Sequence, residues 1–167
     1  MAPYMWKALY KILKAEKDVY AEALNLSNRK ADAVMQGSIE DLECIMELEG
    51  ILNEKKEKSS KDRLQTTLLI ASKMGMEGDA ITLRDIIAAM PGEEAVAMEN
   101  LRQEFSQVLQ DLTVQNETNR HLLMAQLETV GATIERMART MVLGNNYNHQ
   151  GGAEDMLHRV SLLDTTV

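Results

Sequence analysis

One row of side chains in the second half of the chain constrains the fold more than any other feature. From Leu101 to Met141 the row advances by three or four residues, and eleven such steps cover 40 residues, a mean of 3.64. Its members are Leu101, Phe105, Val108, Leu112, Asn116, Asn119, Leu123, Leu127, Val130, Ile134, Met137 and Met141. This period is that of a straight α-helix, not the 3.5 of a left-handed coiled coil. It predicts one helix over residues 92–143, about 75 Å long at ~1.5 Å per residue.

The first half of the chain predicts a helical hairpin. Apolar residues at helical spacing between Met5 and Leu26 predict an amphipathic helix over residues 4–36. Gly37 suits the left-handed position after that helix, and Ser38, followed by Asp41 three residues later, suits the N-cap of the next one. So short a connection turns the second helix back antiparallel to the first, over residues 39–74.

Two segments between the long helices need separate interpretation. Residues 53–63, NEKKEKSSKDR, contain no apolar side chain, so this stretch is either a solvated continuation of the helix or a break at Ser59 and Ser60. Further along, Thr82 with Asp85 predicts a capped short helix over residues 83–90, which Pro91 ends.

These elements predict an all-α fold: an antiparallel helical bundle of three long helices plus a short connecting helix. The bundle domain spans residues 1–143, and residues 144–167, rich in Asn, Gly and His at their start, form a flexible C-terminal tail. The last helix is about 50 residues long and the first about 33, so we expect ~25 Å of it to extend beyond the bundle. Its apolar row continues there and needs a cover: a second copy, the tail, or a bound client.

Charge and hydropathy narrow the classes of function. The chain has 26 acidic and 18 basic residues, a net charge of −8, and no lysine after Lys73. This balance argues against a nucleic-acid-binding surface. The longest apolar run, Ile86 to Met90, has five residues, and no secretory signal is recognisable, so we expect a cytoplasmic protein with no stable membrane insertion. One basic row is either a solvated face, the favoured interpretation, or a contact for an acidic membrane or partner; it comprises Lys7, Lys11, Lys14 and Lys17.

No pattern of residues predicts catalysis. The three histidines are scattered and no Glu-x-x-His pair occurs, so we expect no enzyme, no metal site and no cofactor. Cys44, beside Leu42 and Ile45, is interpreted as a small core residue. Asn116 and Asn119 interrupt the apolar row; buried amides that fix the helix register are favoured over amides that bind a client backbone.

Taken in order, the segments resemble the FlgN family of flagellar export chaperones. The resemblance rests on the hairpin at QGSIEDLE, the polar Lys/Glu run, the capped helix in ITLRDIIAAMPG, the block NETNRHLLMAQLETV and the tail YNHQGG. It implies a chaperone that binds C-terminal helical segments of the hook–filament junction proteins FlgK and FlgL. Such a chaperone prevents their premature assembly and delivers them to the export gate.

The resemblance also implies roles for particular residues. The client-binding part of the long helix corresponds to Leu123, Leu127, Val130, Ile134, Met137 and Met141. Tyr147 occupies the place of a tail tyrosine that contacts the export-gate protein FlhA. The alternative is a structural helical protein that self-associates through its long C-terminal helix, and a weak homodimer is compatible with either interpretation.

Overall fold

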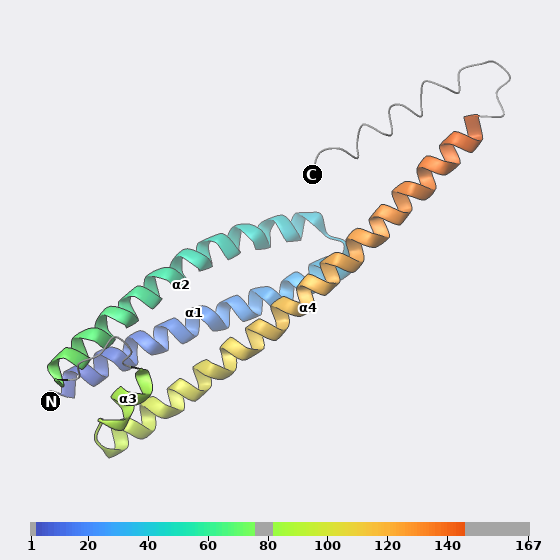
Figure 1. Cartoon of the computed structure of the whole chain (residues 1–167). Coiled ribbons are helices and arrows are strands. Elements are labelled where there is room, and N and C mark those ends of the chain that lie inside the picture. Colours follow the sequence, from blue (N-terminus) through green and yellow to red (C-terminus); the bar gives the residue numbers. More distant parts are fainter. Residues whose placement is uncertain (1–2, 76–81, 146–167) are drawn as a thin grey trace. The chain divides into compact units, whose positions relative to one another are not determined.

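The residues that the structure describes form four α-helices and connecting turns. The computed structural model describes the backbone of residues 3–75 and 82–145 and the side chains of residues 5–75 and 82–141. The helices are α1 (Pro3–Gln36), α2 (Ile39–Lys73), α3 (Leu83–Ala88) and α4 (Gly92–Asn145) (Figure 1). No strand occurs in the described ranges, so the predicted all-α class is confirmed.

The chain forms two compact units, and their boundary falls inside α4. The first unit, Met1–Leu123, contains α1, α2, α3 and the first part of α4, and the second, Met124–Val167, contains the rest of that helix. The hydrophobic core belongs to the first unit, because every buried apolar side chain among the described residues precedes Leu123.

The α1–α2 hairpin forms where the capping residues predict it. Gly37 has a φ of +67°, the left-handed conformation that favours glycine. The Ser38 hydroxyl then accepts a hydrogen bond of 3.4 Å from the amide of Asp41. The two helices pack side by side and antiparallel (Figure 1), and the Lys30 ammonium donates to Glu49 across the hairpin at 2.8 Å.

The polar run 53–63 is helical, which settles the choice that the sequence left open. Partners on α1 anchor this part of α2 in place of apolar burial. Arg63 Nε donates to Glu16 Oε2 at 2.6 Å, and the Lys56 ammonium lies 5.3 Å from the centre of the Tyr20 ring. The break at Ser59 does not occur; its hydroxyl donates to the carbonyl of Lys56 within the helix.

Within the first unit, α4 runs parallel to α1. Lys17 Nζ donates to Glu104 Oε2 at 2.7 Å, and the carbonyl of Ser27 accepts a 2.7 Å hydrogen bond from Asn119. Residues of α1 are therefore level with residues of α4 that are 87 to 92 positions later in the chain. At this offset Gln36, the last residue of α1, is level with residues 123–128.

The core is divided into two clusters. One joins α1, α2, α3 and the start of α4, with Leu9, Ile70, Ile86 and Met98 all at most 1% exposed. α3 is fixed there by a complete capping box between Thr82 and Asp85, as predicted. The other cluster lies further along the three long helices and contains Ala23, Leu26, Ala33, Ile45, Leu52 and Leu112. Each such leucine contributes roughly 1.5–3 kcal/mol by its burial.

The interpretation of Cys44 as a core residue is wrong, because its side chain is exposed. Ile45 and Leu52 face the interior, and Cys44, one residue before Ile45, points about 100° away on the helix. Several apolar residues of α2 also lie outside the core: Ile39, Met46 and Ile51 are more than half exposed. They lie on the two flanks of α2, while only its central face meets α1.

Candidate functional site

Five exposed apolar residues that share one row of α4 in the second unit form the candidate site. We call them the exposed stripe: Leu127, Val130, Ile134, Met137 and Met141, whose side chains are 52% to 76% exposed. All five were predicted from the sequence as client-binding residues. Their spacing of three, four, three and four places them on one face of the helix. Single exposed apolar residues are ordinary on a protein surface, but a continuous helical row of five is not.

The exposed stripe differs from the first part of α4 in the exposure of its apolar side chains. Three preceding apolar members of the same row are almost completely covered: Leu101 is 3% exposed, Phe105 8% and Leu112 8%. Phe105 packs against the Tyr20 ring with centroids 5.3 Å apart. One helix therefore presents the same kind of face twice, once buried in a core and once exposed. Leu123, the first predicted client-binding residue, is half-buried and ends the first unit, and Tyr147 lies outside the described residues.

Polar side chains near the stripe are satisfied within α4 itself. The hydroxyls of Thr129, Thr133 and Thr140 each donate to the carbonyl four residues earlier at 2.9 Å. Arg139 forms an ion pair with Glu135, one turn away. Because these groups already have partners, this face is suited to apolar contact rather than to hydrogen bonding.

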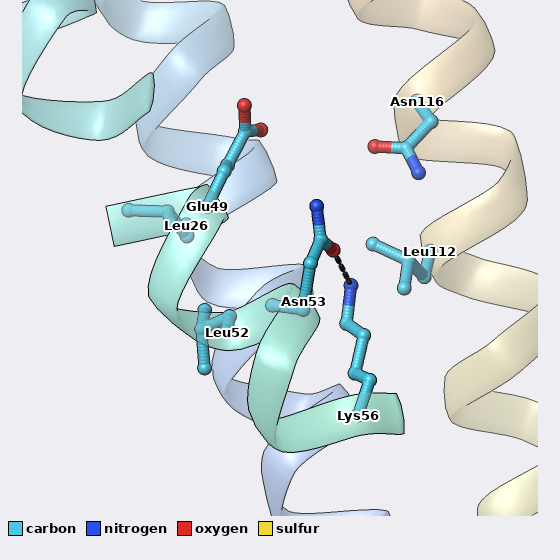
Figure 2. Close-up of a pocket in the computed structure, with 8 residues that line it drawn as sticks. Leu26, Glu49, Leu52, Asn53, Lys56, Leu112 and Asn116 are labelled. Atoms are coloured by element: carbon cyan, nitrogen blue, oxygen red, sulfur yellow. Dashed lines mark hydrogen bonds between the residues drawn. The ribbon is translucent and has the colours of Figure 1, made fainter. Parts of the chain in front are cut away.

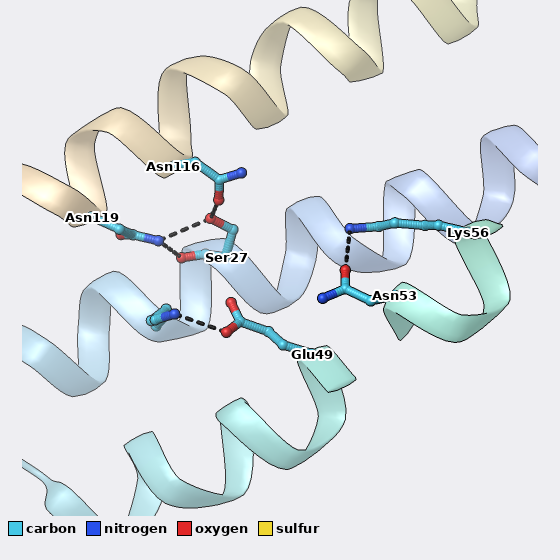
Figure 3. Close-up of polar contacts among 7 residues, drawn as sticks. Ser27, Glu49, Asn53, Lys56, Asn116 and Asn119 are labelled. Atoms are coloured by element: carbon cyan, nitrogen blue, oxygen red, sulfur yellow. Dashed lines mark hydrogen bonds and ion pairs between the residues drawn. The ribbon is translucent and has the colours of Figure 1, made fainter. Parts of the chain in front are cut away.

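Asn119 serves the bundle and not the exposed surface. Its side chain is 3% exposed and donates to the carbonyl of Ser27 at 2.7 Å and to its hydroxyl at 2.9 Å (Figure 3). The Ser27 hydroxyl in turn donates to Asn116 at 2.8 Å. The register interpretation is thus confirmed for Asn119, and the client-binding interpretation is wrong for this residue because its amide is buried and fully engaged. Asn116 is exposed, although its side chain accepts the hydrogen bond from Ser27.

Comparison with known protein families identifies the family to which the chain belongs. The profile of the FlgN protein family matches residues 5–155, which include the exposed stripe, all of α2, α3 and α4, and all of α1 except its first two residues. The chain belongs to the FlgN family. FlgN proteins are flagellar export chaperones, and theirs is a chaperone family and not an enzyme family. No curated protein and no solved structure matches the chain.

This FlgN-family chain has a groove between α1, α2 and α4, but the groove does not resemble a substrate pocket. Its volume of about 220 Å³ is below the roughly 300–1,000 Å³ of ligand pockets. Leu26, Leu52 and Leu112 contribute to its apolar lining (Figure 2). The polar groups at its rim already have partners: Glu49 accepts from Lys30, and Lys56 donates to Asn53 at 3.4 Å. Over residues 5–75 and 82–141, no three His, Cys, Asp or Glu side chains are grouped as a metal would require.

The buried ion pair between Glu16 and Arg63 was not predicted. The Glu16 side chain is only 2% exposed, whereas that of Arg63 is 33% exposed. One signal was available, because Glu16 continues the apolar row formed by Leu9 and Leu13, where an acid requires a partner. Which basic residue supplies that partner depends on how α2 is registered against α1.

None of the described helices is long and apolar enough to cross a lipid bilayer.

Proposed function

We infer that this FlgN-family chaperone binds the C-terminal helical segments of hook–filament junction proteins, of the FlgK and FlgL type, through the exposed stripe. Leu123, on the same row of α4, belongs to the proposed contact. In the cytoplasm the bound client is kept from premature assembly and is delivered to the export gate. The observation that carries this proposal is the exposure of five successive apolar positions on a helix in which Leu101, Phe105 and Leu112 of the same row are buried.

The physical basis is contact between two amphipathic helices. A client segment that forms filament or junction contacts after export has an apolar face, and the stripe offers a matching face over residues 127–141. Burial of roughly 600 Å² of apolar surface at ~25 cal/mol/Å² corresponds to about 15 kcal/mol before association and ordering costs. After those costs, a dissociation constant between about 1 μM and 1 nM is reasonable. Two methionines in the stripe allow it to fit related client sequences, because the thioether side chain is flexible.

The test compares two substitutions that are matched in exposure. Ile134 in the stripe and Val114 in the first unit are both 61% exposed, and both lie on α4. We expect Ile134→Lys to weaken binding of a C-terminal FlgK- or FlgL-type fragment at least tenfold in calorimetry. Val114→Lys should leave that affinity unchanged, and both variants should melt at the wild-type temperature. Equal affinities for the two variants would reject the stripe as the client site.

Delivery to the gate is a separate part of the proposal. It assigns contact with the FlhA-type gate protein to Tyr147 and rests on family resemblance. In this arrangement residues 1–143 act as one chaperone domain and residues 144–167 as the tail that reaches the gate. Tyr147→Ala should retain client affinity in calorimetry while secretion of the junction proteins falls. Normal secretion by this variant would remove the tyrosine from the site.

A second candidate is a structural protein that self-associates through α4. The exposed stripe suits a second copy as well as a client, since two such helices bury each other's apolar rows. Light scattering on a size-exclusion column separates the candidates. We expect a monomer, or a weak dimer, that becomes a one-to-one complex when the client fragment is added. A dimer that persists and ignores the fragment would favour the structural protein.

A further inference from the structure

The outer face of the α1–α2 hairpin carries a row of lysines that no other described part of the first unit covers. Lys7, Lys11 and Lys14 are exposed and succeed one another at steps of four and three. The same row continues along α1 through Asp18 and Glu22. α4 packs on a different row of α1, the one that contains Lys17, Tyr20 and Ser27.

A second row on α2 adjoins the first. Lys55 lies 3.8 Å from Glu22, and a groove lined from both helices runs between the two rows, with Leu48 and Ile51 on its α2 side. Continued toward the end of α2 at steps of three, four, seven and four residues, this row contains Lys58, Asp62, Leu69 and Lys73, all exposed. Since the helices are antiparallel, the lysines at the start of α1 lie beside those at the end of α2.

The combined surface is basic in an acidic protein. We call it the basic face; its residues are Lys7, Lys11, Lys14, Asp18, Lys58, Asp62, Leu69 and Lys73. Five lysines against two aspartates give this face a charge of +3, whereas the whole chain has −8. Within the described part of the chain, none of the five lysines forms an ion pair. α4 contains no lysine at all, so the charge is segregated between the hairpin and α4.

We propose that the basic face binds an anionic lipid surface. A cluster of four to eight cationic side chains on an amphipathic helical surface is the usual requirement for attraction to acidic headgroups. The cations here are all lysines, which act as point charges on a diffuse negative layer rather than as the bidentate forks that recognise carboxylates in proteins. Leu69, 55% exposed among them, supplies an apolar side chain that inserts between headgroups.

Other acidic partners fit the face less well. Single-stranded nucleic acid requires aromatic side chains on which bases stack, and the basic face contains none. To enter an acidic groove of another protein, the lysines would have to form a protruding row. The two packed helices instead present them on a broad surface, which suits a planar partner such as a lipid layer. Binding through this face involves no residue of the exposed stripe, so the proposal does not depend on the proposed function.

Vesicle sedimentation tests the proposal with the full chain. Wild-type protein should sediment with phosphatidylcholine vesicles that contain phosphatidylglycerol, should ignore vesicles of phosphatidylcholine alone, and should be released by salt. The variant K7Q/K11Q/K14Q should bind the anionic vesicles roughly 100-fold more weakly, at about tenfold or less per lysine. The control K61Q/R84Q/R136Q loses the same three positive charges at exposed positions outside the basic face and should bind as the wild type does.

Three results would overturn the proposal. The first is no sedimentation of the wild type with anionic vesicles. The second is an equal loss of binding in the two triple variants, which would show a response to net charge and not to this face. The third is binding to soluble polyglutamate but not to vesicles, which would assign the face to an acidic polypeptide. Circular dichroism should show the same helicity for all three proteins, since the substituted side chains are exposed.

Discussion

The side chain of Asn119 donates hydrogen bonds to both the carbonyl and the hydroxyl oxygen of Ser27, 92 residues earlier in the chain. This contact fixes the parallel register of α4 on α1 near the end of the first unit. A leucine at position 119 would continue the apolar row, but it would allow α4 to slide by a turn along α1. The amide instead specifies one alignment, because only one leaves no buried polar atom without a partner.

The first prediction is a coupling between these two residues. Asn119→Ala should lower the free energy of unfolding by about 1–3 kcal/mol, because it leaves buried polar atoms of Ser27 without their donor. Ser27→Ala alone should cost less, and the double variant should cost less than the two added together, with a coupling energy of about 1 kcal/mol. Urea unfolding measures all three. Strict additivity would show that the two residues act independently.

The second prediction concerns the ion pair between Glu16 and Arg63. Arg63→Met should destabilise the protein by about 3 kcal/mol, because a carboxylate that is 2% exposed is left without its cation. The double variant E16L/R63M should recover most of that loss, since an apolar pair of similar volume suits the site. Lys55→Met is the control: its partner Glu22 is 60% exposed, so the cost should be below about 0.5 kcal/mol. A double variant as unstable as Arg63→Met would contradict this account.

The third prediction concerns pH. The Arg102 side chain donates two hydrogen bonds to the Glu99 carboxylate and Gln103 adds a third, which lowers the pKa of Glu99 from 4.5 to about 2. A carboxyl with a lower pKa in the folded state stabilises the protein above its unfolded pKa. That contribution is lost as the pH falls from about 4.5 toward 2. Glu99→Gln should therefore reduce the difference in melting temperature between neutral and acidic buffer. A carbon-detected NMR titration that places the Glu99 midpoint near 4.5 would disprove the shift.

The fourth prediction contrasts two glycines. Gly37 has a φ of +67°, so Gly37→Ala should cost about 1–2 kcal/mol even though the space around it is open. Gly50 lies inside α2 with no neighbouring atom within 4 Å of an added Cβ, so Gly50→Ala should stabilise the protein by about 1 kcal/mol. Thermal unfolding of the two variants should thus shift in opposite directions. A shift in the same direction would mean that the turn is not held in the left-handed conformation.

Local signals in the sequence predicted the elements of the fold well. The cap at Ser38 and the capping box at Thr82 mark the starts of α2 and α3, and both depend only on neighbours three residues away. The long apolar row likewise predicted a single helix, and α4 extends without a break from Gly92 to Asn145. Such features need no knowledge of the tertiary arrangement, because periodicity and capping act within one helix.

Features that depend on the arrangement of helices were not predictable in the same way. α2 has apolar residues on both flanks, so periodicity did not distinguish the buried Ile45 from the exposed Met46 and Cys44. The partner of Glu16 depends on the register of the hairpin, which many Lys and Glu positions would satisfy almost equally. For the exposed stripe the sequence supplied the residues, and the structure adds that they are exposed while Leu101 and Leu112 in the same row are covered.

The confinement of lysines to α1 and α2 has a practical consequence for chemistry on the intact protein. Reagents that acylate amines react with lysine ε-amino groups in the hairpin, and α4 offers them none over its whole length. Fluorescent dyes, biotin or a sensor surface attached in this way would leave the side chains of Leu127 to Met141 unmodified. The same coupling would neutralise Lys7, Lys11 and Lys14. A single labelled sample thus provides a reporter of client association that has lost the charges of the basic face.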